Sequence, residues 1–353
     1  MTRNTIILPL NSDAEFNRGT VEPLPSPPGN LLANPGNTQI SLTWTAIYDV
    51  IGYRLYYSTS SFSAIDDPGV TQIKIEDPLA TAYTLTGLSN GVKYYIRMLS
   101  VSGAGYGALS SEINSIPSTY TNVYSTVFDG STELVNFGDI PAFHFASAST
   151  FTVVAWVKWI DTFGGQQTIV SNTIVASANV GFNFYKAGGE QLEAELRYNL
   201  ANRIRVQTTE QFANLDEWYH VAVTYDGSGL ASGMKLYING VIGTLTILND
   251  TLVIDVDNWD NWTIGARPNA SDYHLGNLDE IAVYDATLSA TDIAEIYNLG
   301  VPINLINLDS GVDLVSWWRM GDGDTNTTII DNAGTNDGTL VNMDASNYVE
   351  DVP

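Results

Sequence analysis

The stretch Phe151-Thr-Val-Val-Ala-Trp-Val-Lys-Trp159 decides the class of fold. Every second residue of this stretch, beginning with Phe151, is apolar, and a period of two is that of a strand with one face in a core. The stretches Trp218-Tyr-His-Val-Ala-Val-Thr-Tyr-Asp-Gly227 and Leu236-Tyr-Ile-Asn-Gly240 continue the pattern. The second of them ends in Asn-Gly, which is a strong indication of a two-residue hairpin turn. We therefore expect antiparallel strands and an all-β fold.

The region before this one, residues 31–118, has the same period. Every second residue in 40–46 is apolar, and so is every second residue in 94–98. Clusters of Gly, Asn, Ser and Pro separate such stretches, which is typical of an antiparallel sandwich. The length of 353 residues fits two domains of this kind.

Specific residues make this first region similar to a fibronectin type III domain. A pair of prolines leads into it, Trp44 lies on its second expected strand, and Tyr53 lies on the third. The stretch Gly87-Leu-Ser-Asn-Gly-Val-Lys-Tyr94 places Tyr94 where that family has its tyrosine corner, a tyrosine whose hydroxyl binds the backbone a few residues earlier. The resemblance implies a β-sandwich for the whole region.

Residues 119–300 resemble the laminin G-like, concanavalin A-like jelly roll. Five motifs carry this resemblance by their order and spacing, and they are Val127-Phe-Asp-Gly130, 218–227, 236–240, Thr263-Ile-Gly-Ala-Arg267 and Gly276-Asn-Leu-Asp-Glu-Ile-Ala-Val-Tyr284. One short helix is expected after them, because Ser289 and Asp292 have the spacing of a capping box and Gly300 ends the pattern.

The last part of the chain, residues 301–353, contains two further stretches of the jelly-roll family. Leu314-Val-Ser-Trp-Trp-Arg-Met-Gly-Asp-Gly323 and residues 331–340 resemble the opening of that family, although here they follow its end. They either supply a permuted strand to the same sheet or begin a second repeat that stops short. We favour a permuted strand beside residues 278–284, because the tryptophan pair would otherwise leave a large apolar area in water.

Residues 1–30 are expected to form an arm or anchor outside both domains. Four prolines between Pro23 and Pro28 give this segment a stiff, extended end. The first residues contain one positive charge and only a short apolar patch, so we do not expect a Sec signal. No run of about 18 apolar residues occurs, so no membrane-spanning segment is expected.

The chain is strongly acidic, with 39 acidic and 14 basic residues, a formal net charge of −25 and no cysteine. Nucleic-acid binders need basic faces, and anionic membranes repel an acidic surface, so we expect neither partner. Without cysteine there is no disulfide framework and no cysteine-ligated zinc. The acidity fits solubility in salt water, or carboxylates that bind calcium.

No group of residues in the sequence passes as an active site. Glu193 and Glu195 are the nearest candidates, because some jelly rolls of this shape are glycanases with closely spaced acids on one strand. The third acid of the glucanase pattern is missing, since Tyr198 occupies its position. We therefore expect the two glutamates to lie on a solvated strand face, and we expect a protein that is not an enzyme.

The resemblance to the jelly roll implies a calcium ion near its rim, with Asp129 and Asp279 at the matching positions. Calcium takes about six to eight oxygen ligands, which acids and turn carbonyls supply; the alternative is that both are solvated loop acids. Trp259, Trp262 and Tyr273 lie in polar surroundings. They are candidates for a sugar-binding platform at the rim, and the alternative is that they pack in the core.

The two resemblances favour a binding or structural protein. The run Trp-Trp-Arg-Met-Gly-Asp-Gly-Asp at 317–324 resembles jelly-roll proteins of marine bacteriophages. We therefore expect a homo-oligomeric virion surface protein, a head decoration or fibre or a tail fibre, made in the host cytoplasm. It would contact other virion proteins through its N-terminal arm and cell-surface glycans through its jelly roll. The alternative is a bacterial cell-surface or secreted carbohydrate-binding adhesin module, and a polysaccharide hydrolase is a third interpretation that the missing acid disfavours.

Overall fold

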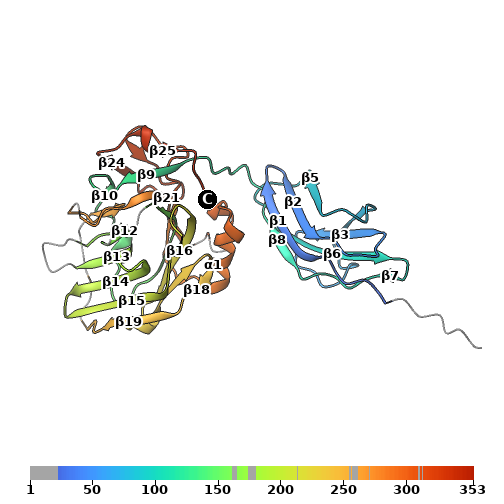
Figure 1. Ribbon diagram of the computed structural model, residues 1–353, viewed down its shortest axis with the longest axis horizontal. Helices are drawn as coiled ribbons and strands as arrows, with labels where there is room; N and C mark the ends of the chain where they lie inside the picture. The colour runs from blue at the N-terminus through green and yellow to red at the C-terminus, as the bar shows by residue number, and fades with distance from the viewer. Residues whose placement is uncertain are drawn as a thin grey trace, which may run out of the picture. The chain divides into compact units, whose positions relative to one another are not determined.

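The protein forms two compact units, Met1–Thr119 and Tyr120–Pro353, and each has its own sheets and core (Figure 1). The structure is a computed structural model that describes residues 23–353 except 161–164, 174–179, 213, 254–255, 257–260, 270, 309–310 and 312. The predicted all-β class is confirmed, because both units consist of antiparallel sheets and α1 (Ala290–Tyr297) is the one α-helix in the described part. None of the described helices is long and apolar enough to span a membrane.

The first unit is a sandwich of two antiparallel sheets. Its strands are β1 (Gly29–Gly36), β2 (Gln39–Thr45), β3 (Gly52–Ser58), β4 (Thr71–Ile75), β5 (Ala82–Thr86), β6 (Tyr94–Ser102), β7 (Gly105–Tyr106) and β8 (Ile113–Ser115). One sheet has the order β1-β2-β5, and the other has the order β4-β3-β6-β7, with β8 also paired to β6. Most of the expected arm, residues 1–22, lies outside the described residues.

The residues that carried the fibronectin resemblance lie where it places them. Trp44 and Tyr53 are buried and pack edge to face, with ring centroids 5.5 Å apart. The Tyr94 hydroxyl accepts a hydrogen bond from the Ser89 backbone N–H at 3.1 Å, which is the tyrosine corner predicted for this position.

The second unit is a jelly roll of two large sheets. In the described part, the nine-stranded sheet contains β19 (Leu245–Asp250), β15 (Asn202–Gln211), β14 (Gln191–Asn199), β13 (Gly181–Lys186), β12 (Gln167–Ser171), β20 (Trp262–Ile264), β10 (Leu134–Gly138), β24 (Gly338–Val341) and β23 (Thr328–Ile329), in this order. The eight-stranded sheet contains β18 (Val241–Ile242), β17 (Met234–Ile238), β16 (Trp218–Asp226), β11 (Thr150–Trp159), β21 (Leu275–Tyr284), β9 (Ser125–Asp129) and β25 (Tyr348–Val349), and β22 (Leu314–Trp318) also pairs with β21.

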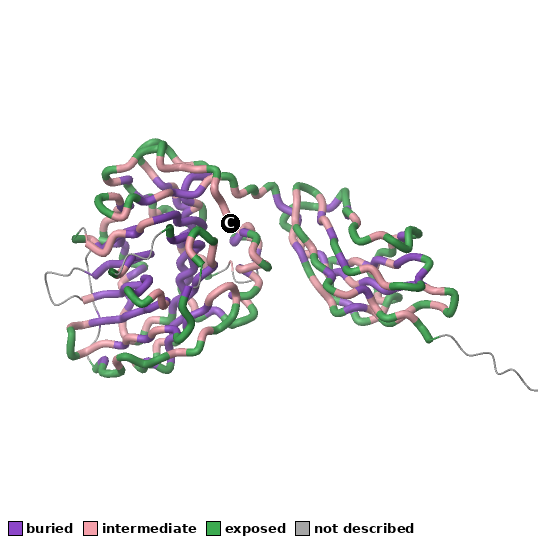
Figure 2. Tube along the Cα trace, viewed as in Figure 1, coloured by how far each residue is buried: buried purple, intermediate pink, exposed green. Residues whose placement is uncertain are grey.

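The main core of the jelly roll lies between these two sheets, and Figure 2 shows the buried residues along the strands of both. The five alternating apolar residues of β11, from Phe151 to Trp159, are at most 1% exposed and all belong to this core. The period of two therefore predicted both the strand and its buried face.

The outer face of the eight-stranded sheet is also covered, by α1. Ile293 and Ile296 of the helix pack in a second apolar cluster on that face. Ser289 and Asp292 form the predicted capping box, in which each side chain accepts a hydrogen bond from the backbone N–H of the other. The outer face of the nine-stranded sheet has no such apolar cluster among the described residues.

The C-terminal residues supply strands to both sheets of their own jelly roll. β22 pairs antiparallel with β21, so that Trp318 lies opposite Ile281 and Trp317 lies opposite Ala282. β24 pairs with β10 in the nine-stranded sheet, and β25 pairs with β9 in the eight-stranded sheet. Trp318 packs in the main core and Trp317 packs in the cluster beneath α1. The structure thus has a strand beside residues 278–284, where the sequence predicts a permuted one.

Candidate functional site

A continuous row of polar residues crosses the outer face of the nine-stranded sheet. Each residue of the row is the direct cross-strand partner of the next. In order they are Thr339 (β24), Asn136 (β10), Thr263 (β20), Ser171 (β12), Asn183 (β13), Glu195 (β14), Arg205 (β15) and Asn249 (β19). Successive residues of a strand point to opposite faces. Because the neighbours Phe182, Leu196 and Ile204 belong to the core, this row lies on the face turned away from the core.

A second polar row lies beside the first, and it joins Thr168, Tyr185, Glu193 and Gln207. The middle of both rows is buried, with Glu193 0% exposed and Glu195 1% exposed. The expectation that these two glutamates lie on a solvated face is therefore wrong. Charged side chains are rarely this buried unless they are paired.

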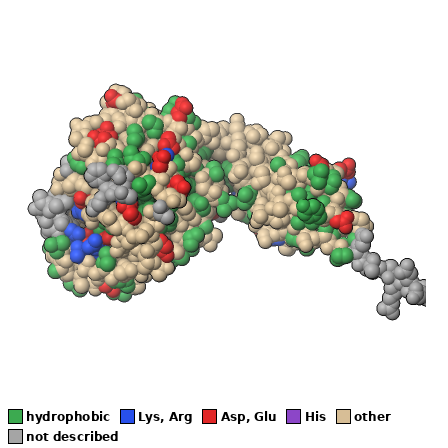
Figure 3. All heavy atoms as spheres, in the orientation of Figure 1, with side chains coloured by type: hydrophobic (Ala, Val, Ile, Leu, Met, Phe, Trp, Pro, Cys, Tyr) green, Lys and Arg blue, Asp and Glu red, His purple; other side chains and the backbone are tan. Residues whose placement is uncertain are grey.

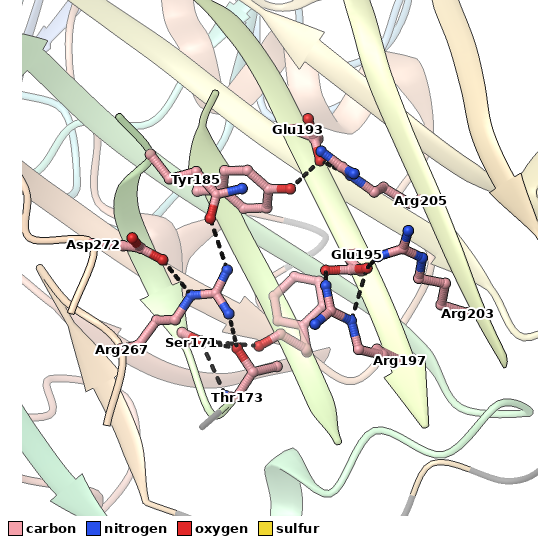
Figure 4. A network of polar contacts seen from close by, with 12 residues as sticks. Ser171, Thr173, Tyr185, Glu193, Glu195, Arg197, Arg203, Arg205, Arg267 and Asp272 are labelled. Atoms are coloured by element: carbon pink, nitrogen blue, oxygen red, sulfur yellow. Dashed lines mark hydrogen bonds and ion pairs between the residues drawn. The ribbon is translucent and has the colours of Figure 1, made fainter. Parts of the chain in front are cut away.

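Two arginines hold the carboxylate of Glu195. Arg197 donates from Nε to Oε1 at 2.9 Å and from Nη2 to Oε2, which makes a bidentate pair. Arg203 donates from Nη1 to the same Oε1 at 3.0 Å. Figure 4 shows these arginines close to Glu195 and extending from β14 and from its neighbour β15. Both carboxylate oxygens of Glu195 are therefore engaged within the sheet face.

The carboxylate of Glu193 is held on one oxygen only. Its Oε1 accepts hydrogen bonds from the Tyr185 hydroxyl and from Nε of Arg205. Burial, and after it the negative charge of Glu193, raises the pKa of Tyr185 well above its usual value, so the phenol keeps its proton and donates it. The other oxygen of Glu193, Oε2, is buried and has no hydrogen-bond partner.

A fourth arginine, Arg267, lies on the other side of Tyr185 in Figure 4. Its Nε pairs with Oδ2 of Asp272 at 2.8 Å, its Nη2 donates to Oε1 of Gln166 at 2.8 Å, and its Nη1 donates to Oγ1 of Thr173 at 3.3 Å. Arg267 therefore joins three segments at the edge of the polar face, and we assign it a positioning role.

Several buried polar atoms of this face have no hydrogen-bond partner. They are both amide atoms of Asn183, Oε2 of Glu193, Oγ1 of Thr168 and Nε of Arg203. A buried polar group without a partner costs roughly 1–3 kcal/mol, so each of them needs an explanation. Donors and acceptors stand side by side here, an arrangement that can bind a ligand that carries both.

The two acids predicted to bind calcium lie apart. Asp129 is exposed at the end of β9, and its carboxylate accepts hydrogen bonds from the backbone and hydroxyl groups of Ser131 and Thr132 at 2.7–3.0 Å. Burial is the largest single effect and raises the pKa of Asp129, but the hydrogen bonds from Ser131 and Thr132 together lower it more, so that it ends well below its usual range.

Asp279 is fully buried on β21, where its Oδ2 accepts from Nδ2 of Asn122 at 2.7 Å. The register places Asp129 opposite Leu275, four residues before Asp279 and so about 13 Å along the strand. The prediction that both acids share one ion is therefore wrong, because calcium–oxygen distances are about 2.4 Å. Nor do the described residues contain a group of three or more histidines and acids that could hold a metal. Calcium binding by the protein as a whole stays a prediction.

The three aromatic residues predicted as a sugar platform have different outcomes. Trp262 is 2% exposed, its indole N–H donates to the Phe143 carbonyl at 3.2 Å, and its ring packs against Phe143 and Phe145. A ring inside the core has no free face for a sugar, so this part of the prediction is wrong. Trp259 lies outside the described residues, and Tyr273 is half-buried, so its role stays a prediction.

The arginines of the polar face were not among the residues predicted from the sequence. Charged residues alternate along β14 at Glu193, Glu195 and Arg197, and along β15 at Arg203 and Arg205. A short turn joins the two stretches, so an antiparallel pairing that brings acids opposite arginines could have been inferred from the sequence.

Comparisons with known proteins agree with this fold. Residues 129–294 match the family model of the Concanavalin A-like lectin/glucanases superfamily, and residues 26–116 match that of the Fibronectin type III domain. A Kelch domain-containing protein of Saccharolobus solfataricus is 29% identical over 99 residues, which are 28% of this chain and only 12% of that protein.

Two solved structures are also similar. A proposed carbohydrate binding protein from Bacteroides ovatus is 15% identical, with a TM-score of 0.47 over 88% of this chain and 90% of that one. The CBM40 domain of a Ruminococcus gnavus IT-sialidase is 16% identical, with a TM-score of 0.37 over 50% of this chain and 99% of that one. From the family models and the two sandwiches, the chain is a fibronectin type III domain followed by a laminin G-like, concanavalin A-like domain.

Proposed function

We propose that this protein is a glycan-binding protein without enzymatic activity, and that the polar face of the nine-stranded sheet is its binding surface. The observation that carries the proposal is the group of buried, unpartnered polar atoms around Asn183 and Glu193. Sugars present hydroxyl groups that donate and accept at once, and a rigid sheet can hold side chains of both kinds in fixed positions. The matched family includes lectins, which supports a carbohydrate ligand.

Binding fits the geometry better than hydrolysis does. A glycosidase needs one carboxyl group that can deliver a proton and a second that is free to attack or to activate water. Glu195 has both oxygens engaged by Arg197 and Arg203, and Glu193 shares one oxygen between Arg205 and Tyr185. In this arrangement the two glutamates hold the arginines in position and do not act as an acid and a base.

We further propose that the protein is displayed on a surface outside the cell, that of a virion in the first place. The pairing of a fibronectin type III domain with a laminin G-like domain supports a surface location. Residues 1–30 would attach the protein to other virion proteins, and several copies would sum weak glycan contacts. Mass spectrometry of purified phage particles tests the location, and finding the protein only on bacterial cell surfaces would favour the adhesin alternative.

The substitution Asn183→Leu tests the binding surface. Leucine has the same number and branching of side-chain heavy atoms as asparagine and removes two buried, unpartnered polar atoms, so the free energy of unfolding should stay the same or rise by about 1–3 kcal/mol. The same change should abolish binding of the full chain, presented on multivalent beads, to a glycan array. A merely structural asparagine would behave in the opposite way, with lower stability and unchanged binding.

Lys235→Gln is the matched control, since Lys235 is exposed on β17 of the other sheet. Glycan binding should survive this change. If the wild-type chain binds no glycan on the array, the proposed function is wrong. Release of reducing ends from any bound glycan would show that the protein is an enzyme.

A further inference from the structure

The polar face also indicates which class of glycan it takes. Resting on the proposed function, we propose that the ligand is an acidic saccharide, and that Arg203 and Arg205 of β15 receive its carboxylate or sulfate group. These two arginines form the outer layer of the polar face.

The arginines lie above the glutamates on the sheet face. The side chains of Arg203 and Arg205 are 16% and 27% exposed, whereas those of Glu195 and Glu193 are 1% exposed. Arg203 and Arg205 are two residues apart on one strand, so they share a face and their Cα atoms are about 6.7 Å apart. A ligand that approaches the face therefore meets guanidinium groups before it meets carboxylates.

Both guanidinium groups keep donors for a ligand. A guanidinium has five N–H donors in a planar fork. Among the described residues, Arg203 donates only from Nη1, to Glu195, and Arg205 donates only from Nε, to Glu193. Apart from the buried Nε of Arg203, the remaining N–H groups can form the two parallel hydrogen bonds by which arginine binds a carboxylate or a sulfate. The glutamates fix the orientation of the arginines, so little side-chain entropy is lost on binding.

The local balance of charge favours an anion, although the chain as a whole is acidic. Among the described residues, four arginines, Arg197, Arg203, Arg205 and Arg267, pair with three carboxylates, those of Glu193, Glu195 and Asp272. Salt at physiological strength screens exposed charges beyond about 8 Å, so distant acids repel a bound anion only weakly. In Figure 3, Lys and Arg atoms come to the surface together on the larger unit.

The unpartnered atoms beneath the arginines would bind the rest of the sugar. Asn183 lies next to Glu195 in the first polar row, and Thr168 and Glu193 belong to the second. Their amide, hydroxyl and carboxylate atoms are buried without a partner, and they would pair with ring hydroxyls once the arginine side chains above them move on binding. The face thus offers an anion site and a hydroxyl site together, which a sugar acid satisfies and a neutral sugar satisfies only in part.

Calorimetric titration of the full chain with three probes tests this inference. The probes are an oligogalacturonate, which carries carboxylates, a carrageenan oligosaccharide, which carries sulfates, and maltohexaose, which is neutral. At least one acidic probe should bind at least ten-fold more tightly than maltohexaose. In Arg203→Gln the affinity for that probe should fall about ten-fold or more, because a hydrogen bond between charged groups is lost.

Arg203→Gln is the informative variant, because Glu195 keeps its bidentate partner Arg197 and is not left as an unpaired buried charge. Lys235→Gln removes the same charge from the other sheet and should leave the affinity unchanged. If Arg203→Gln lowers the melting temperature markedly, Arg205→Lys is the variant whose affinity for the acidic probe tests the inference. It keeps the positive charge beside Glu193 and loses only the planar fork of the guanidinium group.

Three results would overturn the inference. They are equal or tighter binding of maltohexaose, unchanged affinity in both arginine variants, and an equal loss of affinity in Lys235→Gln. In each of these cases the proposed function stands, because the protein still binds a glycan. Absence of binding to all three probes, together with a blank glycan array, contradicts the proposed function itself.

Discussion

Asp279 and Glu280 are adjacent buried acids of β21 that are stabilised in different ways. Glu280 accepts hydrogen bonds from Nε of Arg319 at 3.3 Å and from the indole of Trp317 at 2.6 Å, whereas the amide of Asn122 holds Asp279. Burial, and after it the charge of Glu280, raises the pKa of Asp279 well above its usual value. Burial also raises the pKa of Glu280, to about 7, against the opposing effect of Arg319.

These raised pKa values predict that the jelly roll loses stability as the pH rises from about 4 through neutrality. An acid whose pKa is raised by folding contributes stability below its unfolded pKa of about 4, and this contribution is lost as the pH rises through the folded value. Asp279→Asn should therefore flatten the dependence of unfolding free energy on pH between pH 5 and pH 9. Each unit of pKa difference that is removed corresponds to about 1.4 kcal/mol. Asn122 can turn its amide to pair with the new side chain, because its Oδ1 has no partner.

Urea unfolding at pH 5, 7 and 9 measures this effect. Asp129→Asn is the control, because the pKa of Asp129 is lowered by folding and its contribution is lost only as the pH falls into the acid range. A slope for Asp279→Asn equal to that of the wild type would show that Asp279 is ionised in the folded protein.

Calcium binding can be tested at the same two residues. Asp129 is exposed, ionised and next to Glu133, whose carboxylate accepts the Asp129 backbone N–H at 2.7 Å. If calcium binds at this turn, excess calcium should raise the melting temperature relative to a chelator by the linkage between binding and folding. Asp129→Asn should abolish that rise and Asp279→Asn should not. Equal melting curves with calcium and with chelator would end the calcium interpretation.

At the scale of single elements, the sequence predicted what depends on local pattern. The alternation in β11, the capping box of α1 and the tyrosine corner at Tyr94 each involve residues close together in the chain, and all three are confirmed. The strand beside residues 278–284 could be placed as well, because a tryptophan pair needs a core.

The candidate site depends on contacts between elements that are distant in the chain, and there the predictions from the sequence for Trp262, Glu193 and Glu195 were wrong. Trp262 has polar neighbours in the chain but lies on β20, whose strand partners and packing residues come from β10, β12 and 141–145. Glu193 and Glu195 show the alternation of a solvated face, yet the structure buries them beside arginines of β15. Periodicity identifies the two faces of a strand but does not reveal what covers each face.

At the scale of the whole molecule, the last residues complete the jelly roll, and the two units provide an internal control for testing this. A chain that ends at Asn307 lacks β22, β23, β24 and β25, which belong to both sheets. It would also lose the burial of Trp317 and Trp318, which stabilises the fold by roughly 1.5–3 kcal/mol for each large apolar side chain. Such a loss is a large part of a domain's net stability. We expect the shortened chain to expose the edges of β9, β10 and β21 and to aggregate.

Calorimetry and light scattering check this prediction. The fibronectin unit should keep its own thermal transition in the shortened chain, because its core lies wholly within Met1–Thr119, while the transition of the jelly roll should fall in temperature or vanish. A shortened chain that remains monomeric and keeps both transitions would show that β22 adds nothing to the sheet. Adding residues 308–353 as a separate peptide should restore the jelly-roll transition, because the strand then pairs with β21 without a covalent link. Failure of the peptide to restore it would mean that the tail must be present while the sheets form.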